Sequence, residues 1–96
     1  MVKLQQSSVS KAGYQLSSRS KVRWACRRGM LELDVLLTPF MDNKAYDQLS
    51  DSQQLVFQRL LSCDDPDLFA WFMGHRECPD AELKQMVGLV LQHERF

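Results

Sequence analysis

The side chains best suited to chemistry in this sequence are three cysteines and two histidines. Cys26, Cys63 and Cys78 are an odd number with no short spacing between them, which predicts neither a disulfide framework nor a zinc site. We expect them to behave as small buried hydrophobic residues in a reducing compartment. His75 and His93 lie near predicted helix C-termini, where histidine has an ordinary electrostatic role. The sequence places no recognisable catalytic partner beside any of them.

The sequence motifs of several enzyme and cofactor-binding classes are absent. It contains no HExxH, no paired CxxC, no glycine-rich phosphate loop and no GxSxG. Its four glycines are scattered, whereas the turn that binds a dinucleotide pyrophosphate needs several close together. We therefore predict no catalytic residue, no metal site and no stably bound FAD that belongs to this chain.

Three carboxylates gather in the segment Asp64-Asp65-Pro66-Asp67 and could suggest a hard metal ion. The spacing of an EF-hand and its closing glutamate are missing. An acidic N-cap followed by proline is instead typical of a helix start. We interpret Asp65 as the N-cap of a helix and Pro66 as its first residue.

A third cluster of interest runs from Arg27 to Glu32, where two arginines, a glycine and a glutamate lie within six residues. One interpretation is a corner between two helices with a salt bridge, which would contribute roughly 0 to 1 kcal/mol. The other is a flat recognition patch, in which a guanidinium, the bare backbone of Gly29 and a carboxylate face a partner. The residues alone leave both interpretations open.

Hydrophobic periodicity predicts the helices that position this corner. The first spans about residues 19–28 and is closed by Gly29, which can adopt the left-handed conformation of a helix end. The second begins almost at once, with Glu32 and Asp34 in its first turns, where negative charge is favoured. We expect Pro39 to kink or shorten this second helix, because proline lacks an amide hydrogen.

Start and stop signals predict three further helices. Ser50-Asp51-Ser52-Gln53 matches a capping box. The next helix starts at Asp65-Pro66 and stops at Gly74, and the last opens near Pro79-Asp80. No stretch alternates apolar and polar residues over the length of a strand. Because 96 residues can close only one core, we predict an all-α, compact five-helix bundle in a single domain.

Residues 1–18 are rich in Ser, Gln and Lys and lack apolar periodicity. We predict a flexible N-terminal tail over this range and a helical domain over 19–96. The basic, serine-containing tail also resembles a mitochondrial transit peptide, but it is short and poor in arginine. No apolar run approaches the roughly 20 residues that cross a bilayer, so membrane insertion is not expected.

The net charge of zero hides an asymmetry along the chain. Residues 1–28 carry seven basic residues and no acidic one, whereas residues 29–96 carry five basic and twelve acidic residues. Such a division can mark an arm for an anionic partner, either a nucleic acid or an acidic protein surface. It is equally consistent with a basic segment that lies against the acidic remainder of the same protein.

At the corner, the sequence resembles the succinate dehydrogenase assembly factor 2 family, called SdhE in bacteria. The family signature is Arg-Gly-x-x-Glu, which reads here Arg28-Gly29-Met30-Leu31-Glu32 within the stretch from Trp24 to Asp34. The likeness continues through Pro39-Phe40, the segment 46–49 and the segment CDDPDLF at 63–69, and it covers about residues 20–92. The longer match makes the likeness more specific than the five-residue motif alone.

The resemblance implies a five-helix protein that binds the flavoprotein subunit of succinate dehydrogenase, and in bacteria also of fumarate reductase. Such a protein promotes covalent flavinylation without forming the bond itself, since the FAD and the histidine that reacts with it belong to the flavoprotein. The Cys-Arg-Arg-Gly-Met form implies a bacterial cytoplasm rather than a mitochondrial matrix. We expect a monomer that inserts into no membrane and binds no nucleic acid.

The resemblance also implies a partner-binding site on this sequence. Its matched positions are Arg28, Gly29 and Glu32, and the flanking contact candidates are Lys21, Arg23 and Asp34. Two alternatives remain. Some family members have been described as the antitoxin half of a toxin and antitoxin pair, and the basic N-terminal segment would suit a small nucleic-acid binder whose affinity falls steeply with salt.

Overall fold

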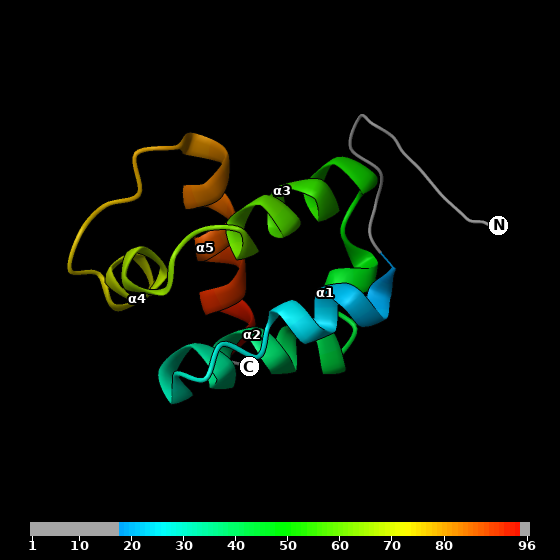
Figure 1. The fold of residues 1–96 in the computed structure, drawn as a ribbon. Helices are drawn as coiled ribbons and strands as arrows, with labels where there is room; N and C mark the ends of the chain where they lie inside the picture. Colours follow the sequence, from blue (N-terminus) through cyan, green and yellow to red (C-terminus); the bar gives the residue numbers. More distant parts are fainter. Residues whose placement is uncertain (1–17, 95–96) are drawn as a thin grey trace, which may run out of the picture.

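Five α-helices and one short 3₁₀ helix make up the computed structural model, which describes residues 18–94 of the chain (Figure 1). The elements are α1 (Arg19–Ala25), α2 (Leu31–Asp42), η1 (Tyr46–Gln48), α3 (Asp51–Leu61), α4 (Asp65–Met73) and α5 (Ala81–Glu94). No strand occurs over this range. The prediction of an all-α, five-helix domain is therefore confirmed. The predicted tail lies outside the described residues, apart from Ser18 at its end.

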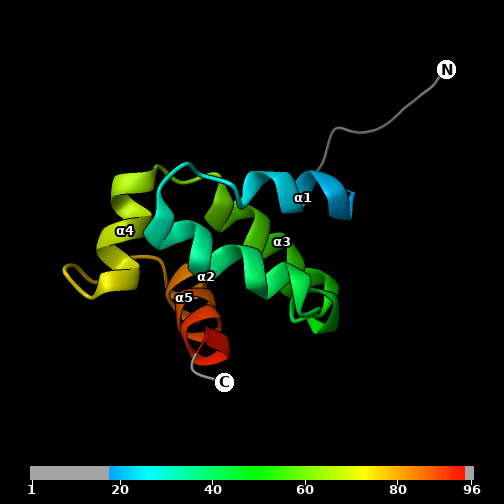
Figure 2. The ribbon, with the colours of Figure 1, turned by 90° about the horizontal axis from the view of Figure 1, so that it is seen from below.

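Helix α5 is the central element of the packing. It packs against α2, α3 and α4, while α2 also contacts α4. Helix α1 lies along the outside of α2 and α3, as the two views in Figures 1 and 2 show. Among the described residues, no helix is both long and apolar enough to cross a membrane.

The core is built from the apolar faces that the periodicity indicates. Leu33, Leu37, Phe40 and Met41 of α2 are almost fully buried. The ring of Phe40 stacks on that of Phe57 in α3 with centroids 5.2 Å apart. The ring of Phe57 also packs on Tyr46, whose hydroxyl accepts a hydrogen bond from Gln58. Burial of such side chains contributes roughly 1.5 to 3 kcal/mol each, and the stacked pair of rings joins α2 to α3.

Two of the predicted helix ends are present as expected. The Ser50 hydroxyl accepts a hydrogen bond from the Gln53 amide, and the Gln53 side chain accepts one from the Ser50 amide, so the capping box is complete. Gly74 ends α4 with φ +77°, a left-handed conformation that residues with a Cβ rarely adopt.

Three helix boundaries differ from the predictions. Helix α1 ends at Ala25, three residues early, because Cys26 and Arg27 donate in a tight turn to the carbonyls of Arg23 and Trp24. Helix α2 is not shortened by Pro39 and runs on to Asp42. The carbonyl that lacks its helical amide donor there is that of Val35, a residue that is 52% exposed.

The third difference is at the start of α4. Asp64, not Asp65, is the N-cap residue, and its side chain makes no capping hydrogen bond. Asp65 is the first helical residue, and its carboxylate pairs with Arg28 of the predicted corner. Sequence spacing could not distinguish two adjacent aspartates, since only one has a partner from a distant segment.

Asp80 supplies an acid-sensitive contact at the start of α5. Its carboxylate accepts hydrogen bonds from the Leu83 amide at 3.0 Å and from the Arg59 guanidinium at 3.2 Å. The Leu83 amide, followed by Arg59, lowers the pKa of Asp80. A carboxyl whose pKa is lower in the folded state stabilises the fold above its unfolded pKa, and that stabilisation is lost as the pH falls through the folded pKa.

We therefore expect Asp80→Asn to lose less thermal stability than the original protein between pH 5 and pH 2. Melting temperatures followed by circular dichroism across this range would measure the difference. Asp51→Asn is the matched control, because Asp51 also lies at a helix start but is exposed and makes no ion pair with a described residue. An unchanged acid dependence in Asp80→Asn would contradict the assignment.

Candidate functional site

The predicted corner is the link between α1 and α2, and Gly29 lies at its exposed turn. Gly29 has φ +80°, and a Cβ built on it would meet no atom within 4 Å. Two separate constraints therefore apply at this position. The backbone conformation favours glycine, and the space in front of it is open, so a partner could approach the main chain closely.

Arg28 points into the protein, and its side chain is only 15% exposed. Its Nε donates to Asp65 Oδ1 at 2.8 Å, and its Nη2 donates to the Cys63 carbonyl at 3.0 Å. Its Nη1 donates to the carbonyls of Ala25 and Leu61, both at 2.8 Å. A salt bridge is thus present at the corner, but it joins Arg28 to α4 rather than to the glutamate of the same motif.

Asp34 binds the backbone of Arg28. Its Oδ1 accepts a hydrogen bond from the Arg28 backbone amide at 2.7 Å. Asp34 is half-buried in the first turn of α2, so it ties the link to the helix that follows. The contact that the resemblance implies between Asp34 and a partner stays a prediction.

Four exposed residues around the turn form what we call the corner surface: Trp24, Gly29, Leu31 and Glu32. The side chains of Trp24 and Leu31 are 73% and 72% exposed, the largest fractions among the exposed large hydrophobic residues of the described chain. Glu32 makes no ion pair or hydrogen bond with any residue in the described range 18–94. Large exposed apolar residues beside a free charge are typical of binding surfaces.

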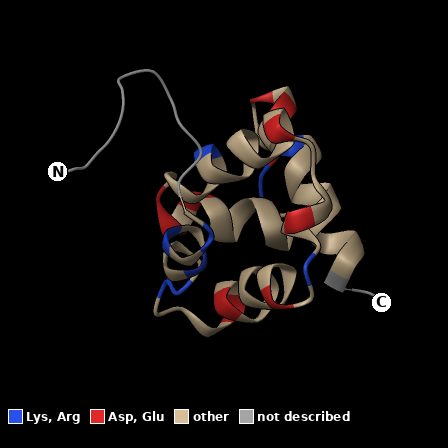
Figure 3. Cartoon of the chain, turned by 90° about the vertical axis from the view of Figure 1, so that its right-hand side faces the viewer, with Lys and Arg blue, Asp and Glu red and all other residues tan. Residues whose placement is uncertain are grey.

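The basic residues that flank the corner divide into paired and free ones. Arg19 binds Asp47 at 2.9 Å, and Arg23 binds Asp42 at 2.6 Å. Figure 3 colours these charges along the chain. Part of the basic segment therefore lies against the acidic remainder, as one of the two interpretations anticipated.

Each of these two ion pairs perturbs its groups in the expected direction. The hydrogen bond from Arg23 lowers the pKa of Asp42, and the hydrogen bond to Asp47 raises the pKa of Arg19. Lys21 and Arg27 are exposed and make no ion pair within the described residues. They are the basic side chains of α1 and the link that remain available to an anionic partner.

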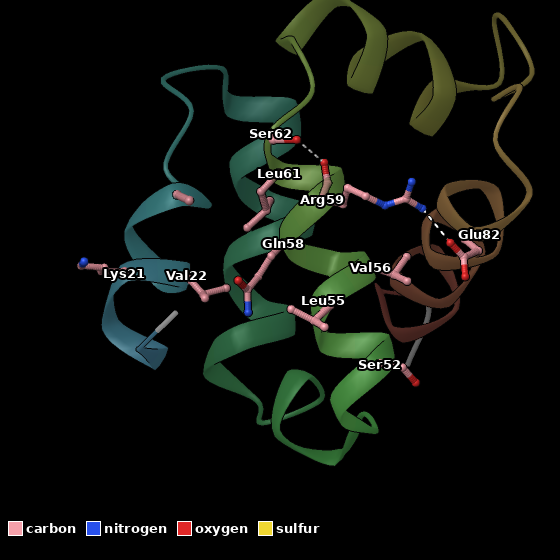
Figure 4. A pocket seen from close by; sticks show the side chains of 11 residues that line it. Lys21, Val22, Ser52, Leu55, Val56, Gln58, Arg59, Leu61, Ser62 and Glu82 are labelled. Atoms are coloured by element: carbon pink, nitrogen blue, oxygen red, sulfur yellow. Dashed lines mark hydrogen bonds and ion pairs between the residues drawn. The ribbon is translucent and has the colours of Figure 1, made fainter. Parts of the chain in front are cut away.

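A groove of about 560 Å³ lies between α1 and α3 (Figure 4). Val22 points into it from α1, opposite Leu55 and Gln58 of α3, while Lys21 points away from α3. The groove is open and largely apolar, with the Arg59 and Glu82 ion pair of 2.9 Å at one end. No reactive group lines it.

The cysteines and histidines, which the sequence offers as candidates for chemistry, are buried or packed against other side chains. Cys26 is completely buried, which raises the pKa of its thiol to about 12. Burial also raises the pKa of Cys63. The rings of His75 and His93 pack edge-on against Phe69 and Phe40 with centroids 5.6 and 5.5 Å apart. Among residues 18–94, no three His, Cys, Asp or Glu side chains gather as a metal site.

Sequence reasoning missed two features of the site. Trp24 and Leu31 fall outside the buried stripes of their helices, so their exposure could have been found from the periodicity. The role of Asp65 had no local signal, because 37 residues separate it from Arg28. Only the packing of α4 beside the corner brings the two together.

Comparisons with known proteins place this arrangement in context. A family model described as flavinator of succinate dehydrogenase matches residues 20–94. The chain is 62% identical over 76 residues to the FAD assembly factor SdhE of Idiomarina loihiensis, covering 79% of this chain and 83% of that protein. It is 63% identical over 73 residues to the FAD assembly factor SdhE of Shewanella oneidensis, covering 76% and 88%.

A solved structure agrees with the fold. The solution structure of a UPF0350 protein is 46% identical in sequence to this chain, with a TM-score of 0.67. The match covers 86% of this chain and 87% of that one.

The burial of the thiols leads to a prediction about their reactivity. Because the thiolate is the reactive form, we expect iodoacetamide at pH 7.5 to modify half-buried Cys63 before Cys26 or Cys78. The two buried thiols should react only at the rate at which the protein unfolds. Mass spectrometry of peptides from a time course would measure the order. Rapid labelling of Cys26 in the folded protein would contradict the burial.

Proposed function

Because this chain belongs to the family described as flavinators of succinate dehydrogenase, we propose that it is an assembly factor that promotes covalent flavinylation. Its partner in this proposal is the flavoprotein subunit of succinate dehydrogenase. The observation that carries the proposal is the corner of the family signature, where the backbone of Gly29 is open and the Glu32 carboxylate has no partner among residues 18–94. Both are available to a partner, while Arg28 is used inside the protein.

The corner surface would act by docking rather than by chemistry. FAD and the histidine that reacts with it are part of the flavoprotein, and the assembly factor holds that protein in a geometry in which they meet. Positioning two groups in a near-attack arrangement lowers a barrier substantially and requires no reactive group on the factor. The buried, protonated thiol of Cys26 is consistent with such a non-enzymatic role.

Each residue of the corner surface would make a different contribution to docking. The bare backbone at Gly29 admits close contact, and Glu32 offers a carboxylate to a cationic or amide donor. Trp24 and Leu31 would bury apolar area, and tryptophan in particular often carries a large share of binding energy. The free cations Lys21 and Arg27 would steer an acidic partner surface toward the corner.

Further details of the proposal extend what the family resemblance implies. We propose that the protein acts as a monomer in the bacterial cytoplasm and serves the flavoprotein of fumarate reductase as well. It would bind no FAD stably when alone. The absence of a glycine-rich turn in the sequence supports this last point.

Gly29→Arg tests the close approach at the corner. In a strain that lacks the chromosomal gene, we expect this variant to fail to restore covalent flavin on the dehydrogenase subunit, because a long charged side chain occupies the open space before the turn. In-gel flavin fluorescence of the denatured subunit is the measurement. The positive φ adds a backbone cost of about 1 to 2 kcal/mol.

Gly74→Arg is the matched control for that cost. Gly74 has nearly the same φ and equally open space, but it ends α4 rather than linking α1 to α2. Both variants should lose similar thermal stability, and only Gly29→Arg should lose flavinylation. Equal activity of the two variants would place the docking site elsewhere.

Glu32→Gln tests the carboxylate. The change keeps size and polarity, and the protein should fold normally because Glu32 has no partner among the described residues. We expect the affinity for the apo flavoprotein to fall about tenfold, the scale of a lost charge-assisted contact. Asp51→Asn, at the exposed start of α3, should bind normally. Normal binding by Glu32→Gln would remove the carboxylate from the site.

A further inference from the structure

We propose that Asp65, the first residue of α4, is a positioning residue for the docking corner. It would act through Arg28 and touch no atom of the partner. The inference rests on the proposed function of the corner, and it adds a residue outside the Arg-Gly-x-x-Glu signature to the docking machinery. The evidence is the set of contacts that fix Arg28 at both ends.

The guanidinium of Arg28 is held from several directions. Its acceptors are the carbonyl of Ala25 at the end of α1, the carbonyl of Leu61 at the end of α3, the carbonyl of Cys63 in the link to α4, and the carboxylate of Asp65. A guanidinium is planar, and its donors point in fixed directions. Four acceptors around one rigid plane therefore determine both its position and its orientation.

The backbone of Arg28 is fixed independently. Asp34 accepts from its amide at 2.7 Å, so the residue is held from α2 at one end and from α4 at the other. Gly29 is the next residue in the chain. Its φ of +80° and its exposed main chain are consequently presented at a place that the two aspartates define.

Asp65 differs from the other acceptors because it alone carries charge. Carbonyl oxygens can accept hydrogen bonds from a guanidinium but cannot neutralise it. The side chain of Arg28 is 15% exposed, and a charge that is mostly removed from water is costly without a counter-ion. Without the carboxylate, the arginine gains from turning outward to water, and the link that contains Gly29 then loses its attachment to residues 61–65 and is held by Asp34 alone.

Asp65 also stabilises the start of α4, and a test must separate this role from its effect on the docking corner. As the first residue of α4, its negative charge favours the helix start. Asp67 lies in the same first turn and shares this role, but it pairs with exposed Arg76 and not with a corner residue. Asp67→Asn is therefore the matched control for the helix contribution.

The experiment compares full-length Asp65→Asn and Asp67→Asn at a temperature well below both melting transitions. One readout is the dissociation constant for the purified apo flavoprotein of succinate dehydrogenase. The other is the position of the Gly29 and Glu32 amide resonances in ¹H–¹⁵N spectra. We expect Asp65→Asn to shift these resonances and to weaken binding about tenfold, whereas Asp67→Asn changes binding less than about twofold.

Asp65→Glu keeps the charge and the helix start but adds one methylene group. It should fold as the original protein does and bind with an affinity between those of the original and of Asp65→Asn. If Asp65→Asn does not fold, Asp65→Glu decides the question, and the proposal then requires a shifted Gly29 resonance with weaker binding. Original resonances and affinity in that variant would overturn it.

Two results overturn the proposal where Asp65→Asn folds. One is unchanged binding, and the other is equal weakening in Asp65→Asn and Asp67→Asn, which would reduce the effect to the helix start. Gly29→Arg distinguishes a failure of the positioning role of Asp65 from a failure of the docking corner. If Gly29→Arg abolishes binding and Asp65→Asn does not, only the positioning role fails. If neither variant affects binding, the docking corner itself is wrong.

Discussion

The charge of Arg28 sets the constraint on which the shape of the corner depends. Its guanidinium is mostly removed from water, and four acceptors around it come from the end of α1, the link after α3 and the start of α4. A buried charge of this kind requires all of these partners together, because losing one leaves an uncompensated group. The stretch from Ala25 to Arg28 is thereby fastened to the distant stretch from Leu61 to Asp65, beside the exposed turn.

That constraint separates two roles within one five-residue motif. Arg28 is directed inward and fixes the link, while Gly29 and Glu32 are left at the surface. The left-handed turn at Gly29 reverses the chain between an inward arginine and an outward glutamate. A single short motif can in this way combine a structural anchor with the binding surface that we propose. The protein needs no catalytic group for the role that we propose.

Much of this fold could be predicted from the sequence because local rules determine it. The capping box at Ser50, the glycine end at Gly74 and the apolar stripe of α2 each depend on residues within one or two helical turns. Motif resemblance then located the corner. The pairing of Arg28 with Asp65 could not be predicted, because it depends on how α4 packs against the link.

The errors at helix boundaries have the same origin. Asp64 and Asp65 are equally good caps by their chemistry, and only the tertiary contact of Asp65 with Arg28 distinguishes them. The apolar pattern of α1 continues to Cys26, yet a tight turn closes the helix at Ala25. Helix α2 continues through Pro39 to Asp42. At the start of α4, a contact that the local sequence does not contain decides the result.

The most direct test of the docking corner is a titration of ¹⁵N-labelled full-length protein with the apo flavoprotein of succinate dehydrogenase. We predict that the amide resonances of Gly29, Leu31 and Glu32 and the indole resonance of Trp24 weaken first, at the lowest ratios of partner. Met73, an exposed apolar residue at the end of α4, serves as the reference away from the corner. Early loss of the Met73 resonance with an unaffected corner would contradict the proposed docking surface.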